Sequence, residues 1–210
     1  RKSDADAERL TRALNRLGPS YIKLGQFLAT RPDLVGAEVA LTLGKLRDEI
    51  EPFPEAEARA TVEKTLGRPV EALFDTFSPP VAAASISQVH KATIATEDGE
   101  RAVAVKVLRP GIRSRFRRDL DTFYAGARTL ERLDPAARRL RPVAVVDTLA
   151  RSVTIEMDLR LEAAALSEMA EATANDPGFR VPTVAWERTA RDVLTLEWID
   201  GIKLSDIAAL

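Results

Sequence analysis

One charged residue inside an otherwise apolar strand pattern constrains the fold of this chain more than any other feature. Residues 101–108 alternate β-branched and small apolar side chains, and a Pro-Gly pair follows them, which predicts a strand that ends at a turn. Alternate side chains of a strand point to opposite faces, so Lys106 shares a face with Ala104 and Leu108. An ammonium on such a face needs an anion. The small Ala104 leaves room beside it for a flat, phosphate-bearing ligand.

The composition is that of a globular protein. The 210 residues are 45% hydrophobic and 30% charged, which is ordinary usage and enough for an independent core. The 31 basic residues nearly cancel the 32 acidic ones, so no bulk attraction to nucleic acid or anionic lipid is expected. No apolar run approaches the roughly 18–20 residues of a membrane span, and no signal peptide opens the chain.

Metal-binding residue types are scarce. The chain has no cysteine and a single histidine, His90, which excludes disulfides and thiolate sites and argues against a histidine-built zinc site. We therefore interpret His90 as structural. The chain begins at Arg1 without a methionine and stops at Leu210 within a helical pattern, so we expect it to be a fragment of a longer protein.

Helical spacing of apolar residues surrounds a short β region. The helical zones are residues 4–67, 112–133 and 142–173, and the first includes a helix over 55–66 that Gly67 closes. The β region covers residues 74–108, where Asp98-Gly99 separates two runs as in a hairpin.

Two further strands are predicted at about 181–187 and 192–199. Together with the earlier runs they give a mainly antiparallel sheet of about five strands. The chain is therefore predicted to be an α+β protein in which a long helix, residues 142–173, precedes the last two strands.

This long helix supplies an anion for Lys106. One helical stripe comprises Ile155, Leu159, Glu162, Leu166 and Met169. Glu162 is its only charge, and an unpaired carboxylate on a sheet-facing seam is costly, so we predict that Glu162 pairs with Lys106. The alternative is that Glu162 reaches solvent at the edge of the stripe and that Lys106 lies at a sheet margin.

Small side chains form the connection between the first two runs of the β region. Residues 81–89 include Ala82, Ala83, Ala84 and Ser85, which would let the backbone approach a ligand as glycine loops do over phosphates, but with a stiffer chain. The alternative is a tight hairpin in an alanine-rich protein. Lys106 on the following strand favours the nucleotide loop.

Four motifs in a fixed order resemble one family. They are Lys23-Leu24-Gly25-Gln26, the alanine-rich loop Ala82–Ser85, the strand lysine Lys106, and Glu156-Met157-Asp158 with Glu162. The order is similar to that of a protein-kinase N-lobe with its Lys–Glu pair. More narrowly, the chain resembles the UbiB-type atypical kinase family of ubiquinone biosynthesis and lipid homeostasis over residues 18–204.

The resemblance implies a role for each motif. Lys106, paired with Glu162, would grip the nucleotide phosphates, and the alanine-rich loop would cover them. Val89 and Ala104 would frame the adenine, and the hinge would be Glu197, Trp198 and Ile199.

In this family a helical extension folds over the active site. Lys23 and Gln26 would then point toward Glu156 and Asp158 and block ordinary protein substrates. From the residues alone, Lys23 and Gln26 could equally form a solvated helix edge. Glu156 and Asp158 diverge on a regular helix, so a shared site would need one of them to serve another neighbour.

The chain also departs from the family pattern. Ser87 stands where the family loop has glycine, and no catalytic-loop aspartate or Asp-Phe-Gly metal ligand is present. We therefore expect ligands for Mg²⁺ to lie outside these residues, and the fragment to be inactive alone. The predicted organisation is an extension over 1–68, a kinase-like N-lobe over 69–203, and the start of a C-lobe over 204–210.

The predicted function is ATP binding for an atypical kinase or ATPase in isoprenoid-quinone or lipid metabolism. The alternative is a non-catalytic pseudokinase scaffold that binds nucleotide or a prenyl-lipid and regulates partner enzymes. A conventional protein kinase is disfavoured by the extension. Expected partners are a nucleotide and prenyl-lipid or quinone-biosynthesis proteins, with no nucleic acid. Expected localisation is cytoplasmic or peripheral membrane, with any membrane attachment through parts outside this chain.

Overall fold

The chain folds into two compact units whose segments interleave along the sequence. The computed structural model describes residues 2–44, 46, 50–97 and 99–202, with side chains from residue 9 onward. Unit 1 contains residues 1–53, 82–88 and 108–158, and unit 2 contains residues 54–81, 89–107 and 159–210. Residues 1, 45, 47–49, 98 and 203–210, which include the predicted start of a C-lobe, lie outside the described residues.

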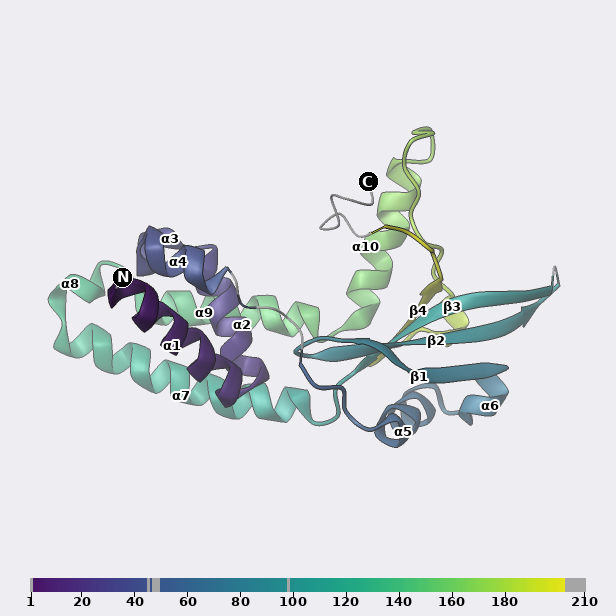
Figure 1. The fold of residues 1–210 in the computed structure, drawn as a ribbon, viewed down its shortest axis with the longest axis horizontal. Helices are drawn as coiled ribbons and strands as arrows, with labels where there is room; N and C mark the ends of the chain where they lie inside the picture. Colours follow the sequence, from purple (N-terminus) through teal and green to yellow (C-terminus); the bar gives the residue numbers. More distant parts are fainter. Residues whose placement is uncertain (1, 45, 47–49, 98, 203–210) are drawn as a thin grey trace. The chain divides into compact units, whose positions relative to one another are not determined.

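Unit 1 is helical (Figure 1). Its helices are α1 Lys2–Leu17, α2 Pro19–Ala29, α3 Pro32–Val35, α4 Ala37–Leu43, α7 Ile112–Leu133, α8 Pro135–Arg138 and α9 Pro142–Glu156. Buried Leu14, Leu43 and Leu46 form a core against which Tyr21 and Leu28 pack. The predicted helix over 112–133 is confirmed as α7.

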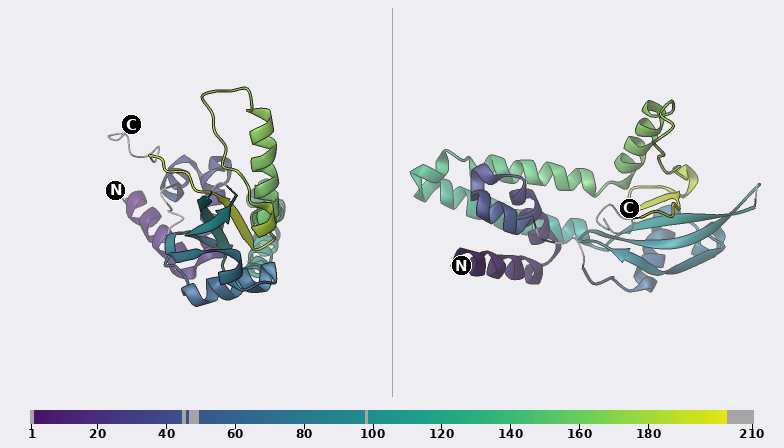
Figure 2. Two further views of the ribbon diagram at one scale, coloured as in Figure 1. Left: turned by 90° about the vertical axis from the view of Figure 1, so that its right-hand side faces the viewer. Right: turned by 45° about the horizontal axis from the view of Figure 1, so that its top comes forward.

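Helices α7 and α9 form a hairpin with the short α8 at its end (Figures 1 and 2). The Tyr124 hydroxyl donates to Asp147 Oδ1 at 2.7 Å and joins the two long helices. The Asp134 side chain caps α8 by accepting from the Ala136 N–H, as N-cap carboxylates do. Arg141, at a φ of 50°, turns the chain into α9.

Unit 2 is built on a four-stranded antiparallel sheet in the order β1-β2-β3-β4. The strands are β1 Thr76–Ala83, β2 Ser87–Thr96, β3 Gly99–Leu108 and β4 Val193–Glu197. The connection between β1 and β2, within residues 82–88, belongs to unit 1. The predicted alternation of β3 is confirmed, because Val103, Val105 and Val107 are fully buried. Lys106 faces the other way and pairs in register with Leu194 of β4.

Helix α5 Glu55–Leu66 packs in unit 2 and contacts β4. It ends at Gly67 with a φ of 70°, as predicted, because glycine adopts this left-handed conformation without a Cβ penalty. Buried Ala58 and Val62 lie on its inner face. The four-residue helix α6 Val70–Leu73 follows and leads into β1.

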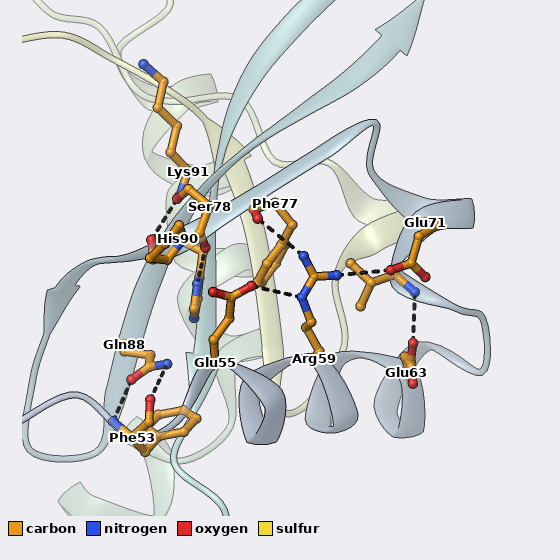
Figure 3. A network of polar contacts seen from close by, with 12 residues as sticks. Phe53, Glu55, Arg59, Glu63, Glu71, Phe77, Ser78, Gln88, His90 and Lys91 are labelled. Atoms are coloured by element: carbon orange, nitrogen blue, oxygen red, sulfur yellow. Dashed lines mark hydrogen bonds and ion pairs between the residues drawn. The ribbon is translucent and has the colours of Figure 1, made fainter.

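A polar network links α5 to the first two strands (Figure 3). Arg59 Nε donates to Glu55 at 3.0 Å, its Nη1 donates to Glu71 at 3.1 Å, and its guanidinium lies 5.1 Å from the centre of the Phe77 ring. The imidazole of His90 stacks on the same Phe77 ring, with 4.5 Å between the two ring centres. These contacts order the α5 end of the sheet.

Two sequence-based expectations were wrong in detail. The helix predicted over 142–173 breaks after Glu156, and α10 Leu159–Ala172 begins afresh. The predicted apolar stripe therefore does not continue across the break: Leu159 is buried, but Ile155 is 58% and Met169 49% exposed.

The sheet has four strands among the described residues instead of about five. The segment predicted as a strand over 181–187 pairs with β4 as an isolated bridge between Val184 and Leu196. Pro182 cannot donate a ladder hydrogen bond, and the chain coils into the 3₁₀ turn η1 Trp186–Arg188. The predicted α+β class is confirmed.

Candidate functional site

The central pair of unit 2 joins Lys106 on β3 to Glu162 on α10. Lys106 Nζ donates to Glu162 Oε1 at 2.9 Å and to Oε2 at 2.7 Å. The predicted pairing is therefore confirmed as a contact, although the Glu162 side chain also reaches solvent. The two side chains are 29% and 41% exposed, so the pair contributes little to stability while the ammonium stays accessible.

The break between α9 and α10 determines where Glu162 lies, because α10 starts anew at Leu159. The Leu159 N–H donates to the Arg191 carbonyl oxygen at 3.0 Å, and the side chains of Leu159 and Ala163 are fully buried. These residues fasten the first turn of α10, which contacts β4. Glu162 projects from that fixed turn, so its position does not depend on the preceding helix.

Two small or branched residues flank the pair on the strands. Ala104 precedes Lys106 by two positions on the same face of β3, and Val89 lies on β2; both are half-buried. Both residues therefore lie on strands of the sheet and are partly accessible to solvent. Their predicted role beside an adenine stays a prediction.

The predicted hinge continues from the end of β4. The Trp198 N–H donates to the Ala102 carbonyl oxygen at 3.1 Å, and the Trp198 indole donates to Asp200 at 2.8 Å. The ammonium of Lys91 lies 4.7 Å from the Trp198 ring centre. Ile199 is exposed, so the backbone at this point lies near the surface of unit 2.

Glu197 has a local structural task at the start of this segment. Its carboxylate accepts from Arg180 and from the Thr183 N–H, the latter at 3.3 Å. Burial alone would raise the pKa of Glu197, but the Thr183 N–H and the Arg180 guanidinium together lower it. The side chain of Glu197 therefore secures residues 180–183, and its backbone N–H is engaged there too, donating to the Thr183 carbonyl oxygen at 2.8 Å.

The alanine-rich loop belongs to unit 1 and is firmly held. The Ala84 N–H donates to the Ser87 carbonyl oxygen at 2.7 Å, and the Arg109 N–H donates to the Ile86 carbonyl oxygen at 2.8 Å. Ser85 is fully buried. Ser87, which replaces the family glycine, is buried without a positive φ, so this turn does not need glycine.

Gln88 and Arg109 tie the loop to the segment before α5. Gln88 Oε1 accepts from the Phe53 N–H at 2.9 Å, and its Nε2 donates to the Phe53 carbonyl oxygen at 3.2 Å (Figure 3). Arg109 lies 5.1 Å from the Phe53 ring centre and donates to the Glu51 carbonyl oxygen at 3.0 Å. Neither residue was predicted from the sequence, although a glutamine on the core face of a strand requires polar partners.

A second lysine–glutamate contact lies in unit 1. Lys23 Nζ of α2 lies 2.7 Å from Glu156 Oε2 of α9, with side-chain exposures of 15% and 39%. A cavity of about 290 Å³ adjoins this pair; its lining includes Lys23, Gln26, Phe27, Leu149, Ser152 and Glu156. The structure therefore brings Lys23 and Gln26 to Glu156, and the solvated-edge alternative is excluded for Lys23.

Asp158 takes a different position. It follows the end of α9, where its N–H donates to the Ile155 carbonyl oxygen at 3.0 Å, and it is not among the residues that line the cavity. The helix break separates it from Glu156, which agrees with the expectation that the two carboxylates cannot face one partner. Within the described residues, no group of three or more His, Asp or Glu side chains could hold a metal ion.

Gly25 of the same motif has a packing role. A Cβ at this position would lie 2.4 Å from Leu46 Cδ1 and 2.8 Å from Leu14 Cδ1. Helix α2 thus approaches the leucine core too closely for a side chain. The motif residues on either side, Lys23 and Gln26, are held at the cavity by this close packing.

Within the described residues, none of the helices combines the length and the hydropathy needed to cross a bilayer.

The chain was compared with known families and proteins. A family model described as the ABC1 atypical kinase-like domain matches residues 45–210. A relative from Marinobacter nauticus, "Probable protein kinase UbiB", is 43% identical over 204 residues, which cover 97% of this chain and 37% of the relative.

Relatives with the same name occur in other bacteria. That of Cellvibrio japonicus is 42% identical over 97% of this chain and 36% of its own length, and that of Xanthomonas oryzae pv. oryzae is 41% identical over 96% and 37%. The chain spans little more than a third of these relatives. With a family model that matches most of its length, the chain belongs to the ABC1 atypical kinase-like family and is similar to its UbiB kinases.

Proposed function

We propose that this chain forms the ATP-binding part of an atypical kinase or ATPase that acts in isoprenoid-quinone or lipid metabolism. The observation that carries the proposal is that Lys106 Nζ donates to both carboxylate oxygens of Glu162, at 2.9 and 2.7 Å. A strand lysine held by a helix glutamate is the arrangement that positions nucleotide phosphates in protein kinases. The relatives' printed name, protein kinase UbiB, supports the same reaction class.

The residues of the pair fit a phosphate ligand. An ammonium has three N–H donors, and the Glu162 carboxylate takes two of them, which leaves one direction for a phosphate oxygen. Lys106 is 29% exposed, so a ligand can reach it. The methyl group of Ala104, two residues earlier on the same face, leaves space beside the ammonium.

Each residue has a defined task in this proposal. Glu162 holds the Lys106 ammonium in one rotamer, and Lys106 binds the negative charge of the α- and β-phosphates. The bound Mg-ATP supplies the phosphoryl group and the metal charge that neutralises it. The Mg²⁺ ligands are expected in the remaining length that the relatives have. The blocking of protein substrates by the extension stays a prediction.

The test is Lys106→Ala in the full-length protein, with Lys64→Ala on the exposed side of α5 as the matched loss of a lysine. We expect Mg-ATP to raise the melting temperature of the wild type and of Lys64→Ala but not that of Lys106→Ala, since ligand stabilisation requires binding to the folded state. Equal nucleotide-dependent stabilisation in all three would show that Lys106 does not grip the phosphates.

A turnover assay on the same proteins separates the enzyme from the pseudokinase scaffold. An atypical kinase or ATPase releases ADP from Mg-ATP, with or without an acceptor. A full-length protein that is stabilised by Mg-ATP and releases no ADP would be the non-catalytic scaffold.

A further inference from the structure

Trp198, the middle residue of the predicted hinge, is held by its main chain, by the edge of its ring and by the face of its ring. Its N–H donates to the Ala102 carbonyl oxygen at 3.1 Å, and its indole N–H donates to Asp200 at 2.8 Å. The Lys91 ammonium lies 4.7 Å from the ring centre. Two of these three contacts come from other strands of unit 2, so the conformation of Trp198 depends on residues distant in the chain.

Lys91 reaches Trp198 across a whole strand. The order of the sheet is β1-β2-β3-β4, Lys91 lies on β2, and Trp198 directly follows β4. Neighbouring strands lie about 4.8 Å apart, so the backbones of β2 and β4 are about 10 Å apart, a gap that a lysine stem and an indole bridge together. On the face between them, β3 has Ala102 and Ala104, whose methyl groups leave the path open.

The contact lies on the face of the sheet that carries Lys106. His90 on β2 and Val103 on β3 are fully buried and share the core face. Alternation along each strand places Lys91 and Lys106 on the opposite face, and Figure 3 shows the Lys91 side chain directed away from His90. The indole and the Lys106 ammonium are therefore on the same side of the sheet.

The backbone of Lys91 is anchored, and the indole is the partner of its charge. The Lys91 N–H donates to Ser78 Oγ of β1 at 3.0 Å (Figure 3). Among the residues that the structure describes, no carboxylate forms an ion pair with Lys91. A cation over an aromatic face is attracted by the negative charge of the π-system, and tryptophan gives the strongest such attraction. The contact therefore restrains the Trp198 ring.

We propose that Lys91 is a positioning residue for the hinge of the nucleotide site. Lys91 holds the Trp198 ring, and the ring fixes the backbone that follows β4, where the base is bound in the proposed function on which this inference rests. The two lysines of this face then have different tasks. Lys106 binds the phosphates, and Lys91 preorganises the segment that receives the base, which raises affinity because less ordering is required on binding.

The first test compares the Mg-ATP affinities of full-length variants by titration calorimetry. Lys91→Met removes the charge and keeps an unbranched side chain, whereas Lys91→Arg keeps a cation that can lie over the ring. Lys64→Met on α5 is the matched loss of another exposed lysine of unit 2. We expect affinity to fall about two- to fivefold in Lys91→Met, as for the loss of an exposed cation–π contact. Lys91→Arg and Lys64→Met should bind like the wild type.

A double-mutant cycle with Trp198→Leu shows whether Lys91 acts through the ring. Leucine is apolar but has no π-face. In the Trp198→Leu background, Lys91→Met should cause no further loss of affinity, because the partner of the cation is already absent. A further loss as large as in the wild-type background would mean that Lys91 attracts the nucleotide directly, and would overturn the proposal.

Near-ultraviolet circular dichroism without nucleotide reports whether the indole is fixed, since this signal requires ordered side-chain packing. The spectrum of Trp198→Leu defines the share of Trp198. That share should weaken in Lys91→Met and be retained in Lys91→Arg and Lys64→Met. If Trp198→Leu binds no Mg-ATP, these spectra decide whether Lys91 acts through the ring.

Three further results would contradict the role of Lys91. They are an unchanged Mg-ATP affinity in Lys91→Met, an equal loss in Lys91→Met and Lys91→Arg, and an unchanged near-ultraviolet spectrum in Lys91→Met. Failure of the proposed function looks different, because the wild type itself would then not bind Mg-ATP.

Discussion

A close contact between a lysine and a glutamate lies in each unit of the molecule, and one of the two contacts was easier to predict from the sequence than the other. Lys106–Glu162 in unit 2 and Lys23–Glu156 in unit 1 both have a shortest distance of 2.7 Å. The first lysine lies on a strand, where every second residue faces the same side, so one charge among apolar neighbours is conspicuous. The second lies on a helix, where a lysine resembles any solvated residue.

The two contacts also differ in what they leave for a ligand. Glu162 binds Lys106 through both carboxylate oxygens on an accessible sheet face, which suits a cation that must be held for a phosphate. Lys23 is the more buried lysine and borders a cavity of about 290 Å³ with Gln26 and Phe27. Of the two contacts, only Lys106–Glu162 is therefore proposed to bind the phosphates of a nucleotide.

Exchange of the charges within each pair is the strongest test of that difference. Lys106→Glu/Glu162→Lys keeps an ion pair but puts a carboxylate where the phosphates would lie. We expect Mg-ATP affinity to fall at least about 1,000-fold, because an attraction is replaced by a repulsion. Lys23→Glu/Glu156→Lys should stay within about threefold of the wild type, since the exchange keeps an ion pair and leaves the proposed phosphate-binding lysine unchanged.

Titration of the full-length proteins with a fluorescent ATP analogue measures both affinities, and a denaturation curve shows that each exchanged protein is folded. A comparable loss of affinity in the two exchanged proteins would contradict the division of roles. It would mean that Lys23 also belongs to the nucleotide site.

The next largest effect should come from Gln88, which anchors the alanine-rich loop. Gln88→Ala leaves the buried N–H and carbonyl groups of Phe53 without the partners that they have at 2.9 and 3.2 Å. An unpaired buried group costs about 1–3 kcal/mol, so we expect unfolding to become easier by about 3 kcal/mol. Gln26→Ala, a half-buried glutamine of the same unit, should cost less than about 1 kcal/mol.

Urea denaturation gives both free energies, and hydrogen exchange locates the change. Faster exchange is expected at the Phe53 amide and at the amide of Ala84 in the loop. An unaltered exchange rate at Ala84 would show that the loop does not depend on the Gln88 anchor.

The sequence predicted the elements that repeat a simple pattern and missed those that depend on contacts distant in the chain. The strand alternation around Lys106, the helix over 112–133 and the glycine end of α5 were correct, because each follows from local spacing or from one special residue. The pairing of Lys106 with Glu162 was also predicted, since two misplaced charges need each other.

The break before α10 could not be predicted from spacing. Residues 155–162 continue a helical pattern, but the Leu159 N–H bonds to the Arg191 carbonyl oxygen instead of to a helical partner. That acceptor lies 32 residues later in the chain, so no local rule reveals it. The anchor of Gln88 on Phe53 is similar, although the glutamine on a core-facing position was a signal that could have been used.

A smaller effect should distinguish the packing of α2 from that of α7. Gly25→Ala introduces a Cβ that would lie 2.4 Å from Leu46 Cδ1, and overpacking of a core costs about 1–3 kcal/mol. Gly126→Ala on α7 meets nothing within 4 Å and should stabilise by about 0.5–1 kcal/mol through helix propensity.

Urea denaturation of the two alanine variants gives opposite signs if the close approach of α2 is real. Nucleotide affinity should be unaffected in Gly126→Ala. If Gly25→Ala also stabilises the protein, then Leu14 and Leu46 can repack, and the glycine of the motif is not required by packing.

The smallest effect concerns pH and belongs to unit 2. Burial lowers the pKa of His90, although the bond of its ring to the Ser78 carbonyl oxygen and the nearby Glu55 act in the opposite direction. Between the lowered folded value and the ordinary value of about 6.5, the unfolded chain binds more protons than the folded one. Stability therefore rises with pH in this window, by no more than about 1.4 kcal/mol per pH unit, and is lost as the pH falls through it.

His90 is the only histidine of the sequence, so the difference between the wild type and His90→Asn isolates its share. The asparagine keeps a donor near the Ser78 carbonyl oxygen, at 2.8 Å from Nδ1 in the wild type, but cannot take up a proton. We expect the wild type to lose stability relative to the variant as the pH falls below 6.5. Parallel curves would mean that His90 has the same proton affinity in both states and that unit 2 tolerates its charge.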